Sequence, residues 1–415
     1  MRPDLQRCFE ATAGLPAAMV FLALAYFAPP AYGQSSPWRF EPTLAVGLEY
    51  DDNAVLFAGL TDDVSAEGYQ VEASARLSYL TELSTFSLTP ILRFGRYDES
   101  ELDFDDKLLN LRYNRQGQVS RFNFRGQFSD QAIRTGERFN VDFDVDNPDE
   151  IPNDDSARVF RSESRQRLRL TPEFTRNLGP KSSVGVRIDY LDLSFPDDIQ
   201  GILTDYTSTR VDGLFEYRWS PRDAWTLRAF HRENEFESGD DGSGVGALIG
   251  YRRNLSETSR LIVRAGYDST NDTIDGDRAT TPIGQLSYIR NFTRTRFLAS
   301  YRRAVAGGGG GRLTVRNSID LTLTRNVSQR VSTGFGVGGY TTRSLDNSDP
   351  SIRIDERDYL QLRGFLSWRV TRSLALDLDY RHTYVDRLLF DGDANSNALV
   401  LWFRYAPNRR EAPAG

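Results

Sequence analysis

The side chains that enzymes use as nucleophiles and bases are scarce in this chain. It has two histidines, His231 and His382, and one cysteine, Cys8. A serine hydrolase needs a histidine base, and neither histidine is accompanied by the Gly-x-Ser-x-Gly pattern of a nucleophile elbow. The glycines at 307–311 precede Arg312 and lack the Lys-Ser/Thr of a phosphate-binding loop. We therefore expect that the protein is not an enzyme.

Oxygen-rich acidic stretches are the one pattern that suits a metal. Residues 140–155 contain acids at alternate positions, Asp142, Asp144 and Asp146 among them, and no lysine or arginine. Carboxylate oxygens at this spacing would suit calcium, although the glycine and the final glutamate of a helix–loop–helix calcium loop are missing. The alternative is a solvated acidic loop. Calcium is thus the only cofactor that the sequence raises.

Arginine is the residue type whose placement points to a function. Arginines recur at alternate positions of segments that have a strand pattern, and acids share the same side. In one interpretation these charges neutralise each other and brace a polar wall. In the other, the arginines recognise carboxylate or phosphate groups of a passing anionic solute. The stretch Arg165-Gln-Arg167-Leu-Arg169 is the clearest basic strip.

These charged positions form two sets on the same side of the strands. The arginines expected to contact solute are Arg76, Arg112, Arg125, Arg165, Arg167, Arg169, Arg210, Arg264, Arg316, Arg363 and Arg381. Further charged residues on that side are Arg93, Arg121, Arg187, Arg228, Glu72, Asp189, Asp212, Glu216, Asp320, Asp377 and Asp379.

The elements that carry these charges are short alternating segments. Residues 398–405 place Leu, Leu, Phe and Tyr on one side and Ala, Val, Trp and Arg on the other. The same period-2 pattern recurs about eighteen times between Trp38 and Tyr405. No run after residue 37 is long and apolar enough for a membrane helix. An apolar face opposite a polar face in strand after strand is typical of a barrel with lipid outside and water inside. A large soluble all-β protein would need more apolar interior faces.

Connections of two lengths alternate along the chain. Tight polar turns fall at roughly 82, 116, 178, 221, 255, 292, 327 and 370, with longer connections between them. This arrangement predicts a single transmembrane, antiparallel, up-and-down β-barrel of about 18 strands, or 16 if one hairpin is miscounted. Short turns would face the periplasm and long loops the outside.

The ends of the chain carry their own pattern. A basic start, an apolar stretch over 15–28 and small residues at Ala31 and Gly33 predict a secretory signal peptide. The predicted organisation is a signal peptide over 1–33, a barrel over 34–405 and a short tail over 406–415.

The segment Gly47-Leu-Glu-Tyr50-Asp51-Asp52-Asn53 resembles a family of outer-membrane β-barrel porins associated with exopolysaccharide-synthesis operons in Gram-negative bacteria. The resemblance extends over the rest of the chain to repeated polar-turn hairpins and an aromatic closing strand, but Tyr405 is followed by a tail instead of ending the chain. The motif positions that carry over to this chain are Tyr50, Asp51, Asp52 and Asn53. Their simpler interpretation is an aromatic girdle residue at the membrane interface followed by a turn.

The resemblance implies an outer-membrane pore that serves export or passage of an exopolysaccharide or its fragments. Its partners would be outer-membrane lipid, lipopolysaccharide, an anionic polysaccharide and periplasmic export components. A net charge of −7 does not favour a nucleic-acid partner. Two alternatives stay open: a general diffusion porin without a dedicated substrate, and a non-conducting structural or adhesion barrel.

Overall fold

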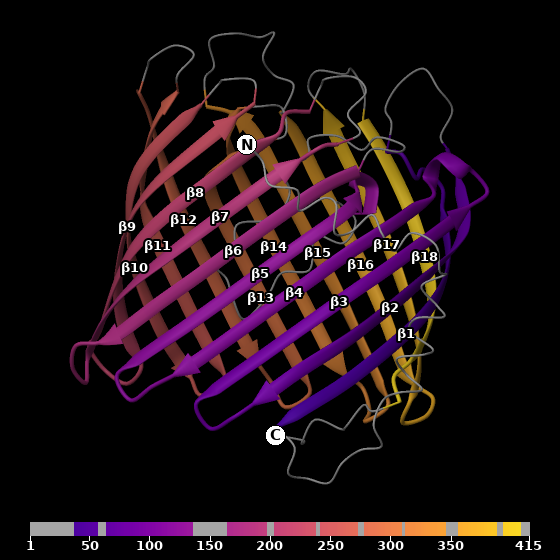
Figure 1. Ribbon diagram of the computed structural model, residues 1–415, viewed down its shortest axis with the longest axis horizontal. Coiled ribbons are helices and arrows are strands. Elements are labelled where there is room, and N and C mark those ends of the chain that lie inside the picture. Colours follow the sequence, from indigo (N-terminus) through magenta and orange to yellow (C-terminus); the bar gives the residue numbers. More distant parts are fainter. Residues whose placement is uncertain are drawn as a thin grey trace.

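Period-2 alternation is realised in three dimensions as one antiparallel sheet that closes on itself (Figure 1). In the computed structural model the described residues are 37–56, 64–135, 164–196, 203–237, 241–272, 278–308, 312–345, 356–387 and 393–407. The strands are β1 (Trp38–Asp51), β2 (Ala66–Leu80), β3 (Ser84–Tyr97), β4 (Phe104–Gln116), β5 (Ser120–Ala132), β6 (Ser164–Asn177), β7 (Ser182–Ser194), β8 (Tyr206–Arg218), β9 (Asp223–Phe236), β10 (Gly242–Ser256), β11 (Ser259–Asp272), β12 (Arg278–Asn291), β13 (Thr295–Gly307), β14 (Leu313–Asn326), β15 (Val331–Ser344), β16 (Arg357–Arg369), β17 (Leu374–Arg387) and β18 (Asp393–Tyr405), with a short 3-10 helix at Ser100–Leu102.

Closure comes from pairing of the first and last strands. Every strand pairs with its neighbours in sequence, and β1 also pairs with β18 from Leu44↔Tyr405 to Asp51↔Ala398. The predicted all-β fold class is confirmed, with 18 strands and not 16. The eight tight turns lie where the sequence predicts them and share one edge of the barrel, the lower edge in Figure 1. We call this edge the turn end and the opposite edge the loop end.

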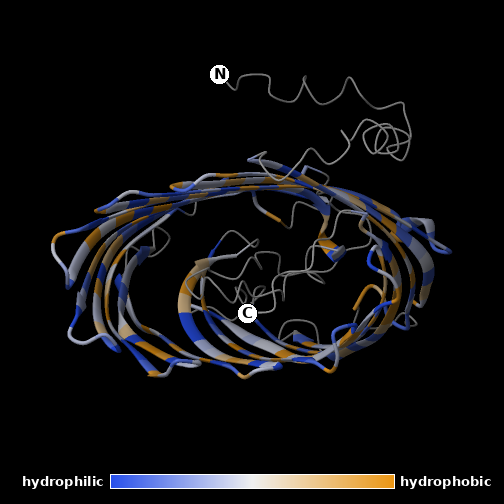
Figure 2. Cartoon of the chain, turned by 90° about the horizontal axis from the view of Figure 1, so that it is seen from below, coloured by the Kyte–Doolittle hydropathy of each residue, from blue (hydrophilic) through white to orange (hydrophobic). Residues whose placement is uncertain are grey.

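The exterior of the barrel is apolar. Outward side chains along each strand are aliphatic or aromatic and accessible, such as Leu48, 54% exposed, and Ile249, 59% exposed. Trp38, Trp225 and Trp368 lie outward near the turn end, where an aromatic girdle is expected at a membrane interface. Figure 2 shows the resulting alternation of hydrophobic and hydrophilic residues around the oval ring.

The interior is polar and tightly paired. Glu49, Gln70 and Asp212 face the lumen and are almost fully buried. Such groups need partners inside the barrel, because a buried polar group without a hydrogen bond is costly. The inward positions are therefore where a function can be built.

Some predictions lie outside the described residues. These are the signal peptide, the acidic stretch with Asp142, Asp144 and Asp146, and most of the tail. No helix within the described ranges is long and apolar enough to cross a membrane.

Candidate functional site

Arginines concentrate on the inner surface of β6 to β11, which we call the basic wall. Strand register places each of them on the lumen side, because they alternate with outward residues such as Val186 and Leu227. The arginines of the basic wall are Arg165, Arg167, Arg169, Arg187, Arg210, Arg218, Arg228, Arg232, Arg252, Arg260 and Arg264. The acids that share it are Glu173, Asp189, Asp212, Glu216 and Asp268. The basic wall thus carries a surplus of positive charge.

Asp189 of β7 is held by arginines from two strands. Arg169 Nε donates to Asp189 Oδ1 at 2.9 Å and its Nη2 donates to Oδ2 at 2.6 Å. Arg187 Nη2 approaches the same carboxylate at 4.0 Å. One bidentate pair therefore satisfies the carboxylate and leaves Arg187 with the weaker contact. The Nε of Arg187 is buried and has no hydrogen-bond partner within the described residues.

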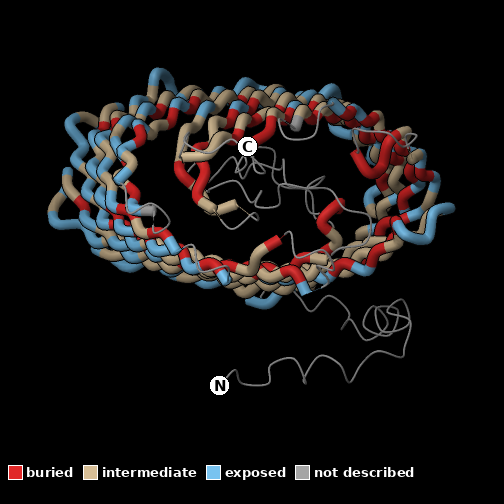
Figure 3. The backbone as a smooth tube through the Cα atoms, turned by 90° about the horizontal axis from the view of Figure 1, so that it is seen from above, coloured by how far each residue is buried: buried red, intermediate tan, exposed pale blue. Residues whose placement is uncertain are grey.

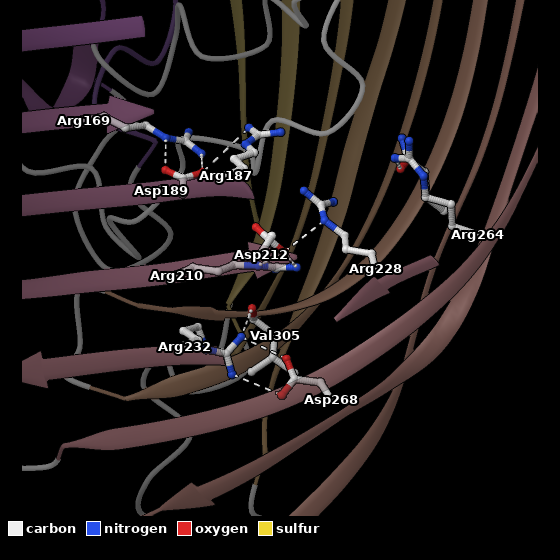
Figure 4. Close-up of polar contacts among 11 residues, drawn as sticks. Arg169, Arg187, Asp189, Arg210, Asp212, Arg228, Arg232, Arg264, Asp268 and Val305 are labelled. Atoms are coloured by element: carbon white, nitrogen blue, oxygen red, sulfur yellow. Dashed lines mark hydrogen bonds and ion pairs between the residues drawn. The ribbon is translucent and has the colours of Figure 1, made fainter. Parts of the chain in front are cut away.

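A second shared acid lies one strand further along. Arg210 Nη2 contacts Asp212 Oδ1 at 2.9 Å, and Arg228 Nε from β9 reaches the same oxygen at 3.0 Å. The guanidinium carbon of Arg210 also lies 3.8 Å from the centroid of the Phe230 ring, a cation–π contact. Figure 4 shows these arginines projecting from neighbouring strands into one part of the lumen.

Arg232 of β9 was missed by the sequence reasoning. It is 3% exposed and its Nη1 donates to Asp268 Oδ2 at 3.0 Å and to the backbone oxygen of Val305 at 2.8 Å. The second of these bonds joins β9 to β13, four strands away in the sheet. Its alternation with Arg228 would have placed Arg232 in the lumen, but no sequence signal indicates its contact with Val305.

A cavity of about 430 Å³ lies against the turn-end half of the basic wall. Its charged lining residues are Arg121, Arg187, Arg218, Arg228, Arg252, Arg264, Glu173 and Glu216. Glu216 is already engaged by Arg218 at 2.9 Å and Arg252 at 3.0 Å. This cavity is large enough for a small organic anion and presents more guanidinium groups than carboxylates.

The other predicted arginines are also inward but lie elsewhere on the ring. Arg363 and Arg381 both contact Asp379, at 2.7 and 3.4 Å. Arg316 stacks 3.6 Å from the centroid of Tyr340. Three others belong to β2, β4 and β5: Arg76, opposite Glu41, and the cross-strand partners Arg112 and Arg125. The predicted set is therefore split, with Arg165, Arg167, Arg169, Arg210 and Arg264 on the basic wall.

The Tyr-Asp-Asp-Asn motif fastens the seam between β1 and β18. Tyr50 is outward and 48% exposed, as a girdle residue would be. Asp52 accepts hydrogen bonds from the backbone N and the Nδ2 of Asn397, at 2.6 and 2.7 Å. Asp51 accepts one from Ser396 Oγ at 2.6 Å, and Asn53 Nδ2 donates to a backbone oxygen of β18. We call these contacts the closing latch.

The two histidines lie on the outward face of the barrel. His231 Nε2 lies 2.9 Å from Glu233 Oε1, and His382 Nδ1 lies 3.0 Å from Asn397 Oδ1. In the part of the chain that the structure describes, no group of three or more His, Cys, Asp or Glu side chains could hold a metal ion.

An apolar exterior, complete strand closure and a charged lumen together define the class of protein. This is the architecture of a transmembrane β-barrel, in which every backbone group is paired and only side chains meet lipid or water.

No family model and no curated protein sequence matches the chain. Among solved structures it is similar to the outer membrane channel DcaP of Acinetobacter baumannii, with 12% identity and a TM-score of 0.43 over 90% of this chain and 98% of that chain. It is also similar to OpdK of Pseudomonas aeruginosa with vanillate, with 10% identity and a TM-score of 0.45 over 88% and 98% of the two chains. The FrpB iron transporter of Neisseria meningitidis shows 10% identity and a TM-score of 0.44 over 90% and 83%. Identity at this level carries no information about the solute.

Proposed function

We propose that this protein is an outer-membrane pore whose lumen favours anionic solutes. The observation that carries the proposal is the cavity on the basic wall, where six arginines face two glutamates. A guanidinium presents a planar fork of donors that matches carboxylate, sulfate or phosphate oxygens, and it stays charged at every physiological pH. A solute carrying such groups would find donors along the wall.

The exterior supports placement in a membrane. Large outward side chains such as Tyr267, 65% exposed, and Leu227, 53% exposed, form a continuous apolar belt. A patch of this extent on a protein in water would promote aggregation, whereas in lipid it is stabilising. In a Gram-negative cell, the outer membrane is where closed strand barrels reside.

The narrower proposal is that the solute is an anionic exopolysaccharide or its fragments, supported by the resemblance carried by Tyr50 to Asn53. A general diffusion porin fits the same geometry, and a non-conducting barrel is the third alternative. A polymer with carboxylate groups would interact with several arginines in succession, whereas a neutral polymer would not.

Ion selectivity in planar bilayers tests the proposal. Under a salt gradient the reversal potential should show preference for anions, and Arg187→Gln, Arg228→Gln and Arg264→Gln together should shift it toward neutrality. Arg115→Gln makes the same type of substitution once, at an exposed outward position at the turn end, and should leave the reversal potential unchanged, whereas each of the three lumen substitutions alone should shift it.

Unchanged selectivity in the folded triple variant would show that these arginines only brace the wall. Transient block by a uronic-acid oligosaccharide, and none by a neutral oligosaccharide of equal length, would favour the polysaccharide. Equal passage of both would favour a general porin, and absence of any conductance would favour a structural barrel.

A further inference from the structure

The wall of the barrel is interrupted at one place near the loop end. β12 pairs with β11 as far as Asn271↔Arg278, but its pairing with β13 stops at Gly284↔Arg303. β13 and β14 nevertheless remain paired with each other up to Gly307↔Leu313. The loop-end part of β13 and β14 therefore separates from β12 as an intact hairpin, which stays joined to the wall by the β14–β15 pairing from Arg316↔Thr342 to Thr314↔Ser344. We call residues 304–307 and 313–316 the inner hairpin.

Pro282 explains where the ladder stops. Arg303 Nε donates to the backbone oxygen of Pro282 at 2.9 Å, so this oxygen faces β13. The N–H and C=O of one strand residue point to the same side, and proline has no N–H. β12 thus lacks a backbone donor toward β13 at Pro282, two residues from Gly284 on the loop-end side. The side chain of Arg303 binds the backbone oxygen that remains there.

Burial shows that the inner hairpin has folded into the lumen. Val305, Leu313 and Val315 lie on the face of β13 and β14 that points outward nearer the turn end. On that part of the face, Tyr301 and Ile319 are 43% and 47% exposed. The three are instead only 2%, 4% and 7% exposed. Figure 3 shows buried segments that turn from the wall into the interior of the ring.

The receiving surface is an apolar patch on the inside of β7 to β9. Val305, Leu313 and Val315 share one buried cluster with other hydrophobic residues, namely Ile133, Leu193, Phe195, Leu203, Tyr206 and Phe236. Such a patch is unexpected in a polar lumen, because Leu193, Tyr206 and Phe236 occupy inward positions otherwise filled by charged groups. Its contact with the inner hairpin accounts for their apolar character.

Two further contacts fix the docked position. Arg232 of the basic wall donates to the backbone oxygen of Val305 at 2.8 Å (Figure 4). Gly242 of β10 allows Leu313 to approach, since a Cβ at this glycine would lie 2.6 Å from Leu313 Cδ1. The backbone and the side chains of the inner hairpin are thus both held.

The same sequence fits a second position. If the β12–β13 register continued past Gly284↔Arg303, Thr281 would pair with Ala306 and Pro282 with Val305. Val305, Leu313 and Val315 would then lie outward in line with Tyr301 and meet lipid. Because these side chains have an apolar environment in either position, a small difference in free energy can separate the two.

We propose that the inner hairpin is a gate at the loop end of the lumen. Docked, it narrows the passage over the basic wall; swung outward, it extends the β12–β13 ladder past Pro282, without the one hydrogen bond that proline cannot donate, and widens the passage. This gate rests on the proposed pore. The movement of the inner hairpin can nevertheless be measured by cross-linking, without conductance.

Paired cysteines test the docked state. In a Cys8→Ser background, Gly242→Cys with Leu313→Cys should form a disulfide under oxidation, because the two side chains meet in the docked hairpin. Conductance should be lowest when this disulfide is intact and should rise severalfold on reduction. Val385→Cys with Ala394→Cys, cross-strand partners in β17 and β18, supplies a matched pair whose oxidation should not change conductance.

A second pair tests the outward state. Thr281→Cys with Ala306→Cys should cross-link slowly, since these residues meet only when the ladder is extended. Phe236→Ala, which weakens the receiving patch, should speed this cross-link and raise conductance. Failure of Thr281→Cys and Ala306→Cys to cross-link, in barrels shown to be folded by a shift in gel migration on heating, would overturn the gate. Equal conductance of the Gly242→Cys, Leu313→Cys variant before and after reduction would overturn it as well. A wild-type barrel that never conducts would refute the pore, while the cross-link would still report the movement.

Discussion

The lumen arginines differ in how fully each one is neutralised. Asp189 receives two hydrogen bonds from Arg169, and Arg187 shares it at a longer distance. The charge of this acid therefore restrains two guanidinium groups at once. Removing this carboxylate should lower the stability of the barrel. It should also make the electrostatic potential in the lumen more positive.

We predict that Asp189→Asn raises the preference for anions and destabilises the barrel. Removing one partner of a buried pair leaves an uncompensated charge and costs about 3–5 kcal/mol. The freed guanidinium groups should in turn attract passing anions. Reversal potentials and urea midpoints measure the two effects.

Asp130→Asn is the matched control, because its partner Lys107 is 59% exposed and the pair is outward. An exposed pair contributes only about 0–1 kcal/mol. A loss of stability in Asp189→Asn with no change in selectivity would mean that the arginines serve the wall alone.

Alternation was sufficient to place every predicted arginine in the lumen, because a strand has only two faces. It could not show which arginines meet. Arg165 and Arg264 share a wall, whereas Arg363 lies on another part of the ring, and this depends on closure and stagger of the whole sheet. The contact of Arg232 with Val305 depends on a strand that separates from one of its two neighbours, which alternation cannot show.

At the scale of elements, the closing latch joins the two strands that are furthest apart in sequence. Asp52 accepts two short hydrogen bonds from Asn397, and this pairing closes the ring at the loop end. The motif was predicted to be a girdle residue and a turn. The structure adds that its acids bind the last strand, a partner that local sequence does not reveal.

We predict that Asp52→Ala lowers the stability of the closed barrel by about 1.5–3 kcal/mol, the range for hydrogen bonds to a charged group. On gels, the folded barrel migrates as a separate band from the unfolded chain. The temperature at which heating removes this folded band should fall accordingly. Asn397→Ala should cost less in the Asp52→Ala background than in the wild type, because the contact with Asp52 is already lost there, while the contacts of Asn397 with Tyr380 and His382 are lost in either background. Asp105→Ala breaks an exposed ion pair with Arg96 and should have little effect. Additive losses in the double variant would refute the latch.

Strands and tight turns were predictable because each is a local pattern. The inner hairpin was not, since Val305 and Val315 follow the same alternation whether they face lipid or the apolar patch. Pro282 was the available signal, because a proline in a strand interior weakens one of its two ladders. Which ladder fails is settled by packing across the lumen.

At the scale of the whole molecule, the exterior decides whether the barrel is built for lipid or water. Ile249 lies at the midpoint of β10, points outward and is 59% exposed, and Leu255 lies outward near the turn end of the same strand. In water, replacing either residue at an exposed site would change stability by roughly 0.5 kcal/mol or less. In a bilayer the cost depends on depth.

We therefore predict that Ile249→Arg destabilises the barrel in lipid vesicles by about 2–4 kcal/mol and that Leu255→Arg costs about 0–1 kcal/mol. The reason is that the midpoint of the strand lies in hydrocarbon, where a guanidinium cannot be hydrated, while the turn end lies where the side chain can reach the headgroups. Reversible urea unfolding in vesicles, followed by tryptophan fluorescence, measures both values. Equal and small costs at the two positions would contradict a membrane-spanning exterior and would favour a soluble barrel, and the pore and its gate would then have no membrane to serve.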